Sequence, residues 1–256
     1  MTARWVVTAP AVAAVVLAGC AGADVGAPAA GSAGRTVVVF AAASTADPVG
    51  RLAAEVEARS PGLDVQVNLA SSDVLALQVA EGAPAEVLVA AGGGAVDRVG
   101  DRAVDPRVFA TDDLVLAVPA GNPAGVRATA DLGRSELRVG RCVRSAPCGE
   151  LAERVLASSG VVPSVDTEEP DAASLLSKVA SGDLDVALLY RRQVASAGPS
   201  VSAVELDPPV STRVEYVVTA LRGPDGSPPS PEATALVERI VAAGDGLFAP
   251  DDGRTG

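Results

Sequence analysis

Four short segments combine small side chains with hydroxyl or carboxylate groups where helices are predicted to begin. They are Ala41-Ala42-Ala43-Ser44, Ala70-Ser71-Ser72, Ser145-Ala146-Pro147-Cys148-Gly149 and Pro170-Asp171-Ala172-Ala173. The first turn of a helix leaves about four backbone N–H groups unpaired and carries roughly half a positive charge. With serine hydroxyls added, such turns can hold an anion without any lysine or arginine. Each segment taken singly is better explained as an ordinary helix cap, because Ser and Asp are preferred there, and only the four together favour a shared cleft.

The chain lacks histidine and the sequence motifs of several common enzyme classes. The chain has no histidine, so the usual general base and a common metal ligand are missing. No Gly-x-Ser-x-Gly motif is present. The pairs Asp112-Asp113 and Glu168-Glu169 are more typical of solvated turns than of acid/base couples, and Gly92-x-Gly94 lacks the third glycine of a dinucleotide loop. We therefore expect a binding protein, with no catalytic residues, no cofactor and no site for a free metal cation.

Composition and charge narrow the class of partner. The 256 residues suffice for one large or two medium domains, and 48% of them are apolar but only 2% aromatic, so Ala, Val and Leu must build the core. The formal net charge is −12 and no basic run exists, which argues against nucleic acid. A field of this sign repels anions at long range, so anion capture would depend on fixed donors at short range.

The N-terminus indicates export from the cytoplasm. Arg4 is followed by a short apolar stretch that ends in Leu17-Ala18-Gly19-Cys20, as in a signal peptide. The order of these four residues resembles the bacterial lipobox, whose cysteine becomes the lipidated first residue. We expect residues 1–19 to be a signal peptide, 20–35 a flexible tether, and Cys20 the lipid anchor on the outer face of the cytoplasmic membrane. An ordinary signal peptide with a chance cysteine is the alternative.

Two further cysteines, Cys142 and Cys148, lie close together in the sequence. Outside the cytoplasm such a pair predicts a local disulfide. Two free thiols remain the alternative.

The middle of the chain alternates short apolar runs with helical patterns, which predicts an α/β fold whose parallel sheets are covered by helices on both faces. In such sheets ligands lie beyond the carboxyl ends of the strands. The predicted strands are 36–40, 63–69, 86–91, 114–118, 137–140, 185–190 and 214–221. The predicted helices contain residues 49–56, 75–79, 151–156, 172–179 and 236–240.

Several motifs resemble those of the periplasmic molybdate-binding proteins. The resemblance covers about Val37 to Phe248. Its motifs are Val39-Phe40-Ala41-Ala42-Ala43-Ser44, Ala70-Ser71-Ser72 followed by Leu75-Ala76-x-Gln78-Val79, Glu81-Gly82-Ala83-Pro84-Ala85-Glu86-Val87, and Ala187-Leu188-Leu189-Tyr190.

The resemblance implies a two-lobed periplasmic-binding-protein fold of type II. Each lobe would hold a mainly parallel sheet flanked by helices, and two strands, Leu114–Pro119 and Val214–Leu221, would cross between the lobes. We expect lobe I to comprise residues 36–116 and 216–248, lobe II residues 117–215, and residues 249–256 to form a disordered tail.

The resemblance also implies a ligand and a set of contacts. Molybdate or tungstate would bind between the lobes and be delivered to the membrane permease of an ABC transporter by a monomeric protein. The contacts fall on the hydroxyls and backbone N–H groups of Ser44 and Ser72, on the backbone at Cys148 and Ala172, and on the hydroxyl of Tyr190. Alternatives are a protein for another small anion, such as sulfate or phosphate, and an interaction module on the cell surface.

One departure from the family pattern concerns charge. Asp73 follows Ser72 directly, where an acid facing a bound dianion would be unfavourable. We expect its carboxylate to point outward near the start of its helix, where a negative charge is stabilising.

Overall fold

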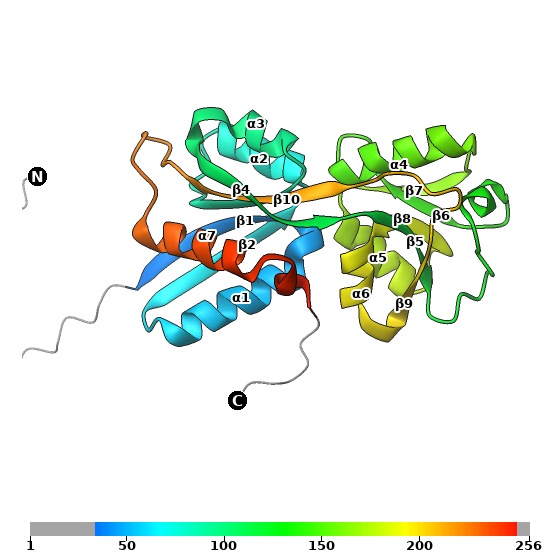
Figure 1. Ribbon diagram of the computed structural model, residues 1–256, viewed down its shortest axis with the longest axis horizontal. Helices are drawn as coiled ribbons and strands as arrows, with labels where there is room; N and C mark the ends of the chain where they lie inside the picture. Colours follow the sequence, from blue (N-terminus) through cyan, green and yellow to red (C-terminus); the bar gives the residue numbers. More distant parts are fainter. Residues whose placement is uncertain (1–33, 250–256) are drawn as a thin grey trace, which may run out of the picture. The chain divides into compact units, whose positions relative to one another are not determined.

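The computed structural model describes residues 34–249. The predicted signal peptide, Cys20, nearly all of the predicted tether and the end of the predicted tail lie outside this range. The described residues form two sheets with helices packed on both faces of each, so the predicted α/β class is confirmed (Figure 1).

The strands are β1 (Arg35–Ala42), β2 (Leu63–Ala70), β3 (Val87–Ala91), β4 (Ala103–Asp112), β5 (Leu114–Pro119), β6 (Val139–Cys142), β7 (Val165–Glu169), β8 (Val186–Tyr190), β9 (Val201–Val204) and β10 (Val214–Leu221). The α-helices are α1 (Ala46–Arg59), α2 (Ser72–Ala80), α3 (Gly94–Val99), α4 (Pro147–Ser159), α5 (Ala172–Ala180), α6 (Arg191–Ser196) and α7 (Pro231–Ala243). The 3-10 turns are η1 (Ala43–Thr45), η2 (Gly100–Arg102), η3 (Thr129–Gly133), η4 (Gly198–Ser200) and η5 (Gly244–Phe248).

The first sheet has the order β2-β1-β3-β10-β4. Side chains alternate across strand β1, because successive residues of a strand point to opposite faces. Val37 and Val39 pack in the cluster that includes Leu52 of α1, whereas Phe40 packs with Leu75 of α2. Helices α1 and α7 therefore cover one face, and α2 and α3 cover the other (Figure 1).

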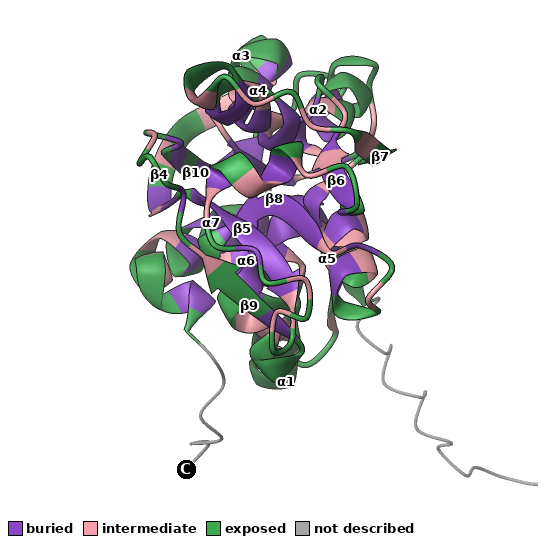
Figure 2. Cartoon of the chain, turned by 90° about the vertical axis from the view of Figure 1, so that its right-hand side faces the viewer, coloured by how far each residue is buried: buried purple, intermediate pink, exposed green. Residues whose placement is uncertain are grey.

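The second sheet has the order β7-β6-β8-β5-β9. Its central strand β8 is buried at all five positions, as expected for a strand covered on both faces (Figure 2). Helix α4 packs on one face, and α5 and α6 pack on the other (Figure 1).

Each sheet is mixed, which differs from the mainly parallel sheets expected. Within residues 34–249, β1 pairs parallel with β2 and β3, and β6 pairs parallel with β7 and β8. The ladders β10–β3, β10–β4, β5–β8 and β5–β9 are antiparallel. Each of these antiparallel ladders involves β5 or β10, the two strands that directly follow the passages of the chain between the sheets.

The places where the chain passes between the sheets also differ from those expected. Leu114–Pro119 pairs entirely within the second sheet, and Val214–Leu221 pairs entirely within the first. The passages are Asp113 and the segment 205–213, so the expected boundary between residues 116 and 117 falls inside β5. The residue ranges assigned to the two lobes, 36–116 with 216–248 and 117–215, remain a prediction.

The strands missing from the sequence interpretation all lie at sheet edges. These are β4, β7 and β9. An edge strand has one paired side and tolerates proline and charge, so its sequence lacks a strong apolar pattern. Strand β4 contains Asp105-Pro106, and β7 reads Val-Asp-Thr-Glu-Glu. The two helices that were missed, α3 and α6, have only six residues each.

Within residues 34–249, no helix combines the length and the apolar character that crossing a bilayer would require.

Candidate functional site

A small cavity lies where the carboxyl ends of strands from both sheets approach one another. Its empty volume is about 230 Å³, counted out to where it opens to solvent. All five residues that the sequence indicated as ligand contacts line it. The lining residues are Ala42, Ala43, Ser44, Ser71, Ser72, Ala91, Pro147, Cys148, Asp171, Ala172 and Tyr190.

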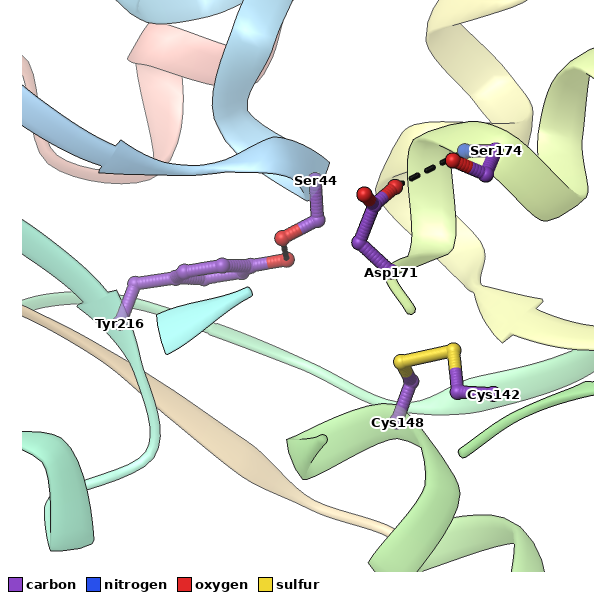
Figure 3. The surroundings of a disulfide bond; sticks show 6 residues. All are labelled: Ser44, Cys142, Cys148, Asp171, Ser174 and Tyr216. Atoms are coloured by element: carbon purple, nitrogen blue, oxygen red, sulfur yellow. Dashed lines mark hydrogen bonds between the residues drawn. A yellow bond between two sulfur atoms is a disulfide. The ribbon is translucent and has the colours of Figure 1, made fainter. Parts of the chain in front are cut away.

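Ser44 reaches the cavity because β1 ends and the chain turns at once into η1. The hydroxyl of Thr45 donates to the carbonyl of Ala42 at 2.7 Å, which stabilises this turn. The Ser44 side chain is only 6% exposed. Its Oγ accepts a hydrogen bond from the hydroxyl of Tyr216 at 3.2 Å (Figure 3).

Ser72 is the first residue of α2 and is almost completely buried. Its Oγ accepts a hydrogen bond from the backbone N–H of Ala91, at the end of β3, at 2.9 Å. This bond ties the start of α2 to the central strand of the first sheet. Because the first N–H groups of a helix lack partners within it, α2 presents backbone donors here as well.

The predicted disulfide between Cys142 and Cys148 is present, with the two Cα atoms 5.7 Å apart (Figure 3). It joins the end of β6 to the first turn of α4, where Pro147 starts the helix. Gly149 is required in this turn, because a Cβ there would lie 2.0 Å from the carbonyl oxygen of Val143. The backbone at Cys148 is thereby held at the cavity wall.

Helix α5 begins at the cavity with Asp171 as its cap. The Asp171 carboxylate accepts the backbone N–H of Ser174 at 2.9 Å, and Ala172 follows as the first helical residue (Figure 3). Asp171 itself lines the cavity, a role that sequence reasoning missed. The sequence marked Pro170-Asp171-Ala172-Ala173 as a candidate segment, but the type and position of Asp171 are those of an ordinary cap, so only Ala172 was expected to contact the ligand.

Tyr190 contributes a buried hydroxyl at the end of β8. The side chain is 2% exposed, and within residues 34–249 its Oη has no hydrogen-bond partner. Burial raises the pKa of this phenol well above its usual range, so the hydroxyl remains a donor. An unpaired buried donor is costly, and such groups in native proteins require an explanation.

The second tyrosine of the chain, Tyr216, was not predicted to belong to the site. Its ring packs at 6.1 Å from that of Tyr190, centroid to centroid, and at 5.0 Å from that of Phe248. Burial raises its pKa well above the usual range. The sequence carried only a weak signal for it: Tyr216 is one of two tyrosines in the chain and lies within the predicted strand 214–221.

Of the two aspartates Asp73 and Asp171, only Asp171 lines the cavity. Asp73 is absent from the cavity lining, and its Oδ1 lies 3.5 Å from the guanidinium of Arg98 on α3. Its predicted outward orientation is confirmed. The cavity lining contains no lysine or arginine, so the donors come from hydroxyls and helix starts, and Asp171 is its one charged side chain.

This arrangement can bind a small ion that is rich in hydrogen-bond acceptors. Two serine hydroxyls, one tyrosine hydroxyl and the starts of α2, α4 and α5 converge on it. Among residues 34–249, no group of three or more His, Cys, Asp or Glu side chains is placed to hold a metal ion.

Residues 37–243 match a protein family described as bacterial extracellular solute-binding protein. The chain belongs to this family. The solute-binding protein is 32% identical over 228 residues to the molybdate-binding protein ModA of Mycobacterium tuberculosis (strain ATCC 25618 / H37Rv), covering 86% of this chain and 87% of the relative. It is 28% identical over 213 residues to ModA of Haemophilus influenzae (strain ATCC 51907 / DSM 11121 / KW20 / Rd), covering 77% and 82%. The family resemblance seen in the sequence is thus confirmed.

Two solved structures share the fold of this solute-binding protein. The periplasmic molybdate-binding protein of Azotobacter vinelandii superposes with a TM-score of 0.69 at 17% identity, covering 83% of this chain and 97% of the other. The sulfate-binding protein SubI of Mycobacterium tuberculosis H37Rv superposes with a TM-score of 0.68 at 18% identity, covering 84% of both chains. The family is extracellular, which agrees with the predicted location outside the cytoplasm.

Proposed function

We propose that this solute-binding protein captures molybdate, and also tungstate, for delivery to the membrane permease of an ABC transporter. The observation that carries the proposal is the buried Tyr190 hydroxyl, which lacks a partner within residues 34–249 and borders a small cavity lined by further donors. Relatives named as molybdate-binding proteins support the choice of ion.

The ligand contacts that we propose are Ser44, Ser72, Cys148, Ala172 and Tyr190. The serine and tyrosine hydroxyls turn their protons to the ion, and the first turns of α4 and α5 add backbone N–H groups. Three of these residues belong to the second sheet and its helices, and two follow strands of the first sheet. The ion would therefore be enclosed between two lobes built on the two sheets.

A site made of donors favours an ion that carries no proton of its own. Phosphate keeps at least one proton near neutral pH, and that proton needs an acceptor. A donor facing another donor leaves buried polar groups unsatisfied. Asp73 lies against Arg98 and outside the cavity lining, and the carboxylate of Asp171, the one acidic group in the lining, accepts the N–H of Ser174 as the cap of α5. Sulfate carries no proton, so only its smaller size, which lengthens several hydrogen bonds at once, separates it from molybdate.

Calorimetric titration of the ligand-free protein with molybdate, tungstate, sulfate and phosphate tests the proposal. We expect molybdate and tungstate to bind with similar affinity and both to bind more tightly than sulfate or phosphate. Tighter binding of sulfate or phosphate than of molybdate would contradict the assignment, as would the absence of binding by every ion.

We further propose that a diacylated Cys20 holds the protein on the outer face of the cytoplasmic membrane as a monomer. The support is the Leu17-Ala18-Gly19-Cys20 motif and the Ala/Gly-rich segment after it. One acyl chain anchors a protein only marginally, so stable retention needs more than one. Mass spectrometry of the mature N-terminus should find a lipidated Cys20; an unmodified terminus at another residue would exclude the anchor.

A further inference from the structure

The three helices that begin at the cavity differ in the residue that caps them. The caps are Ser71 for α2, Ala146 for α4 and Asp171 for α5. Each helix start carries roughly half a positive charge, which attracts an anion. Of the three caps, only Asp171 adds a negative charge, so the first turn of α5 presents an ion with backbone N–H groups beside a carboxylate.

The carboxylate of Asp171 faces the space that the ion would fill. Asp171 lines the cavity together with Ser44, and α5 is in contact with η1, the turn that holds Ser44. One carboxylate oxygen accepts the N–H of Ser174 at 2.9 Å, and Figure 3 shows the carboxylate on the side of α5 where Ser44 lies. The capping bond therefore leaves the negative charge at the cavity, whose lining has no lysine or arginine to offset it.

The acids in the first turns of α2 and α4 lie outside the cavity lining. Asp73 on α2 lies 3.5 Å from the guanidinium of Arg98. Glu150 on α4 is exposed and lines a neighbouring groove that also contains Arg154. Salt screens an exposed charge, whereas a charge that faces a small cavity is screened much less. Asp171 is thus the acid whose charge a bound ion meets most directly.

We propose that Asp171 sets the charge selectivity of the site, so that a dianion is held less tightly than the donors alone would hold it. This inference rests on the proposed function. Repulsion between two charges is proportional to their product, so the carboxylate costs a dianion twice the free energy that it costs a monoanion of the same size. The hydrogen-bond donors attract the ion, and Asp171 limits how tightly it is held.

Tungstate and perrhenate are the matched probes, because both are tetrahedral ions of four oxygens and nearly equal size, and tungstate carries one more negative charge. In Asp171→Asn and Asp171→Ser a neutral side chain keeps the cap. We expect tungstate affinity to rise by about tenfold in both variants, and perrhenate affinity by about threefold, the square root of that factor. The serine variant tests whether the gain comes from a new amide donor, which only asparagine brings.

Titration calorimetry, directly or by displacement of tungstate, measures both affinities in the parent, in the two variants and in the control Glu150→Gln. The control removes the acid in the first turn of α4, and we expect it to change tungstate affinity by less than about twofold. Equal gains for the two ions would overturn the proposal, because the effect would then come from fit and not from charge. A loss of tungstate affinity would also overturn it, since the carboxylate would then help to hold the ion.

The tungstate measurement decides alone if perrhenate displaces tungstate from none of the proteins. A gain in both variants but not in the control then supports the proposal, and no gain overturns it. Thermal unfolding of the ligand-free proteins checks that the neutral caps leave the fold intact. Failure of the parent to bind any oxyanion would instead overturn the proposed function itself, so the two failures are distinguishable.

Discussion

Asp112, the last residue of β4 in the first sheet, accepts the backbone N–H of Arg192 in the first turn of α6, which packs on the second sheet; the distance is 3.2 Å. The same carboxylate accepts the N–H of Asp113, the residue through which the chain passes between the sheets. In the opposite direction, the guanidinium of Arg192 donates to the carbonyl of Thr111 at 2.8 Å and to Asp245 at 2.7 Å. The hydrogen bonds of Asp112 and Arg192 thus hold together the two segments that meet where the chain passes between the sheets.

Asp112 should make the stability of the protein depend on pH. Burial raises the pKa of its carboxyl from 3.8 to about 6, against the opposing effect of the two N–H donors and Arg192. A raised carboxyl pKa favours the protonated form in the folded state, so the stabilisation is complete below the unfolded pKa and is lost as pH rises through about 6. Two pKa units correspond to about 3 kcal/mol.

The variant Asp112→Asn isolates this contribution, because the amide oxygen can still accept the two N–H groups. Chemical unfolding of parent and variant at a series of pH values should show the parent losing about 3 kcal/mol relative to the variant between about pH 3 and pH 7. A constant difference between the two proteins over that range would show that Asp112 titrates as an ordinary carboxyl.

Tyr190→Phe should weaken molybdate binding without destabilising the ligand-free protein. The hydroxyl has no partner within residues 34–249, so its removal relieves an unsatisfied buried group. Loss of one hydrogen bond to a charged acceptor costs about 1.5–3 kcal/mol, or about ten- to hundredfold in affinity. Titration calorimetry and thermal unfolding of the ligand-free variant measure the two effects. Binding equal to that of the parent would remove Tyr190 from the contact set.

Ser72→Ala should weaken binding and also destabilise the ligand-free protein. The variant leaves the N–H of Ala91 buried without its acceptor, at a cost of about 1–3 kcal/mol. Tyr190→Phe is the matched control, because it also removes one hydroxyl from this cavity but should leave the stability of the ligand-free protein unchanged. Equal stability of the two ligand-free variants would contradict the hydrogen bond from the N–H of Ala91 to Ser72.

Asp171→Asn should strengthen molybdate binding. The carboxylate is the one charged side chain in the cavity lining, and asparagine caps a helix as well as aspartate does. Removing a like charge beside a dianion should raise affinity by about tenfold or more. Asp73→Asn is the matched control, because Asp73 lies outside the cavity lining and should have a small effect that salt screens. Weaker molybdate binding in Asp171→Asn would mean that the carboxylate takes part in recognition.

Replacing both disulfide cysteines, Cys142→Ser with Cys148→Ser, should lower stability by about 2–3 kcal/mol, as the chain-entropy estimate gives for a loop of this size. It should also weaken binding, because the start of α4 loses its link to β6. Unfolding and titration of the double variant, with Cys142→Ser alone as a free-thiol control, measure both. Full affinity with lowered stability would confine the disulfide to a structural role.

The sequence by itself determined the central strands and the helices that cover them. Residues such as Val87–Ala91 and Val186–Tyr190 are apolar at nearly every position, because both of their faces are buried, and a pattern that strong needs no tertiary information. The serines at Ser44 and Ser72 were also identifiable, through the resemblance to the molybdate-binding family and their position a few residues after a predicted strand. In the same way, the spacing of Cys142 and Cys148 indicated their disulfide.

Only the tertiary structure decided which polar groups share a cavity and in which direction their hydrogen bonds run. The edge strands β4, β7 and β9 owe their conformation to a neighbour on one side, so their own residues carry a weak pattern. Tyr216 lies 172 positions from Ser44 in the chain, and no local rule connects them. The sequence identifies Asp171 as a helix cap, and only the structure shows that it also lines the cavity. Contacts between distant segments depend on how whole sheets pack, which single-residue preferences do not encode.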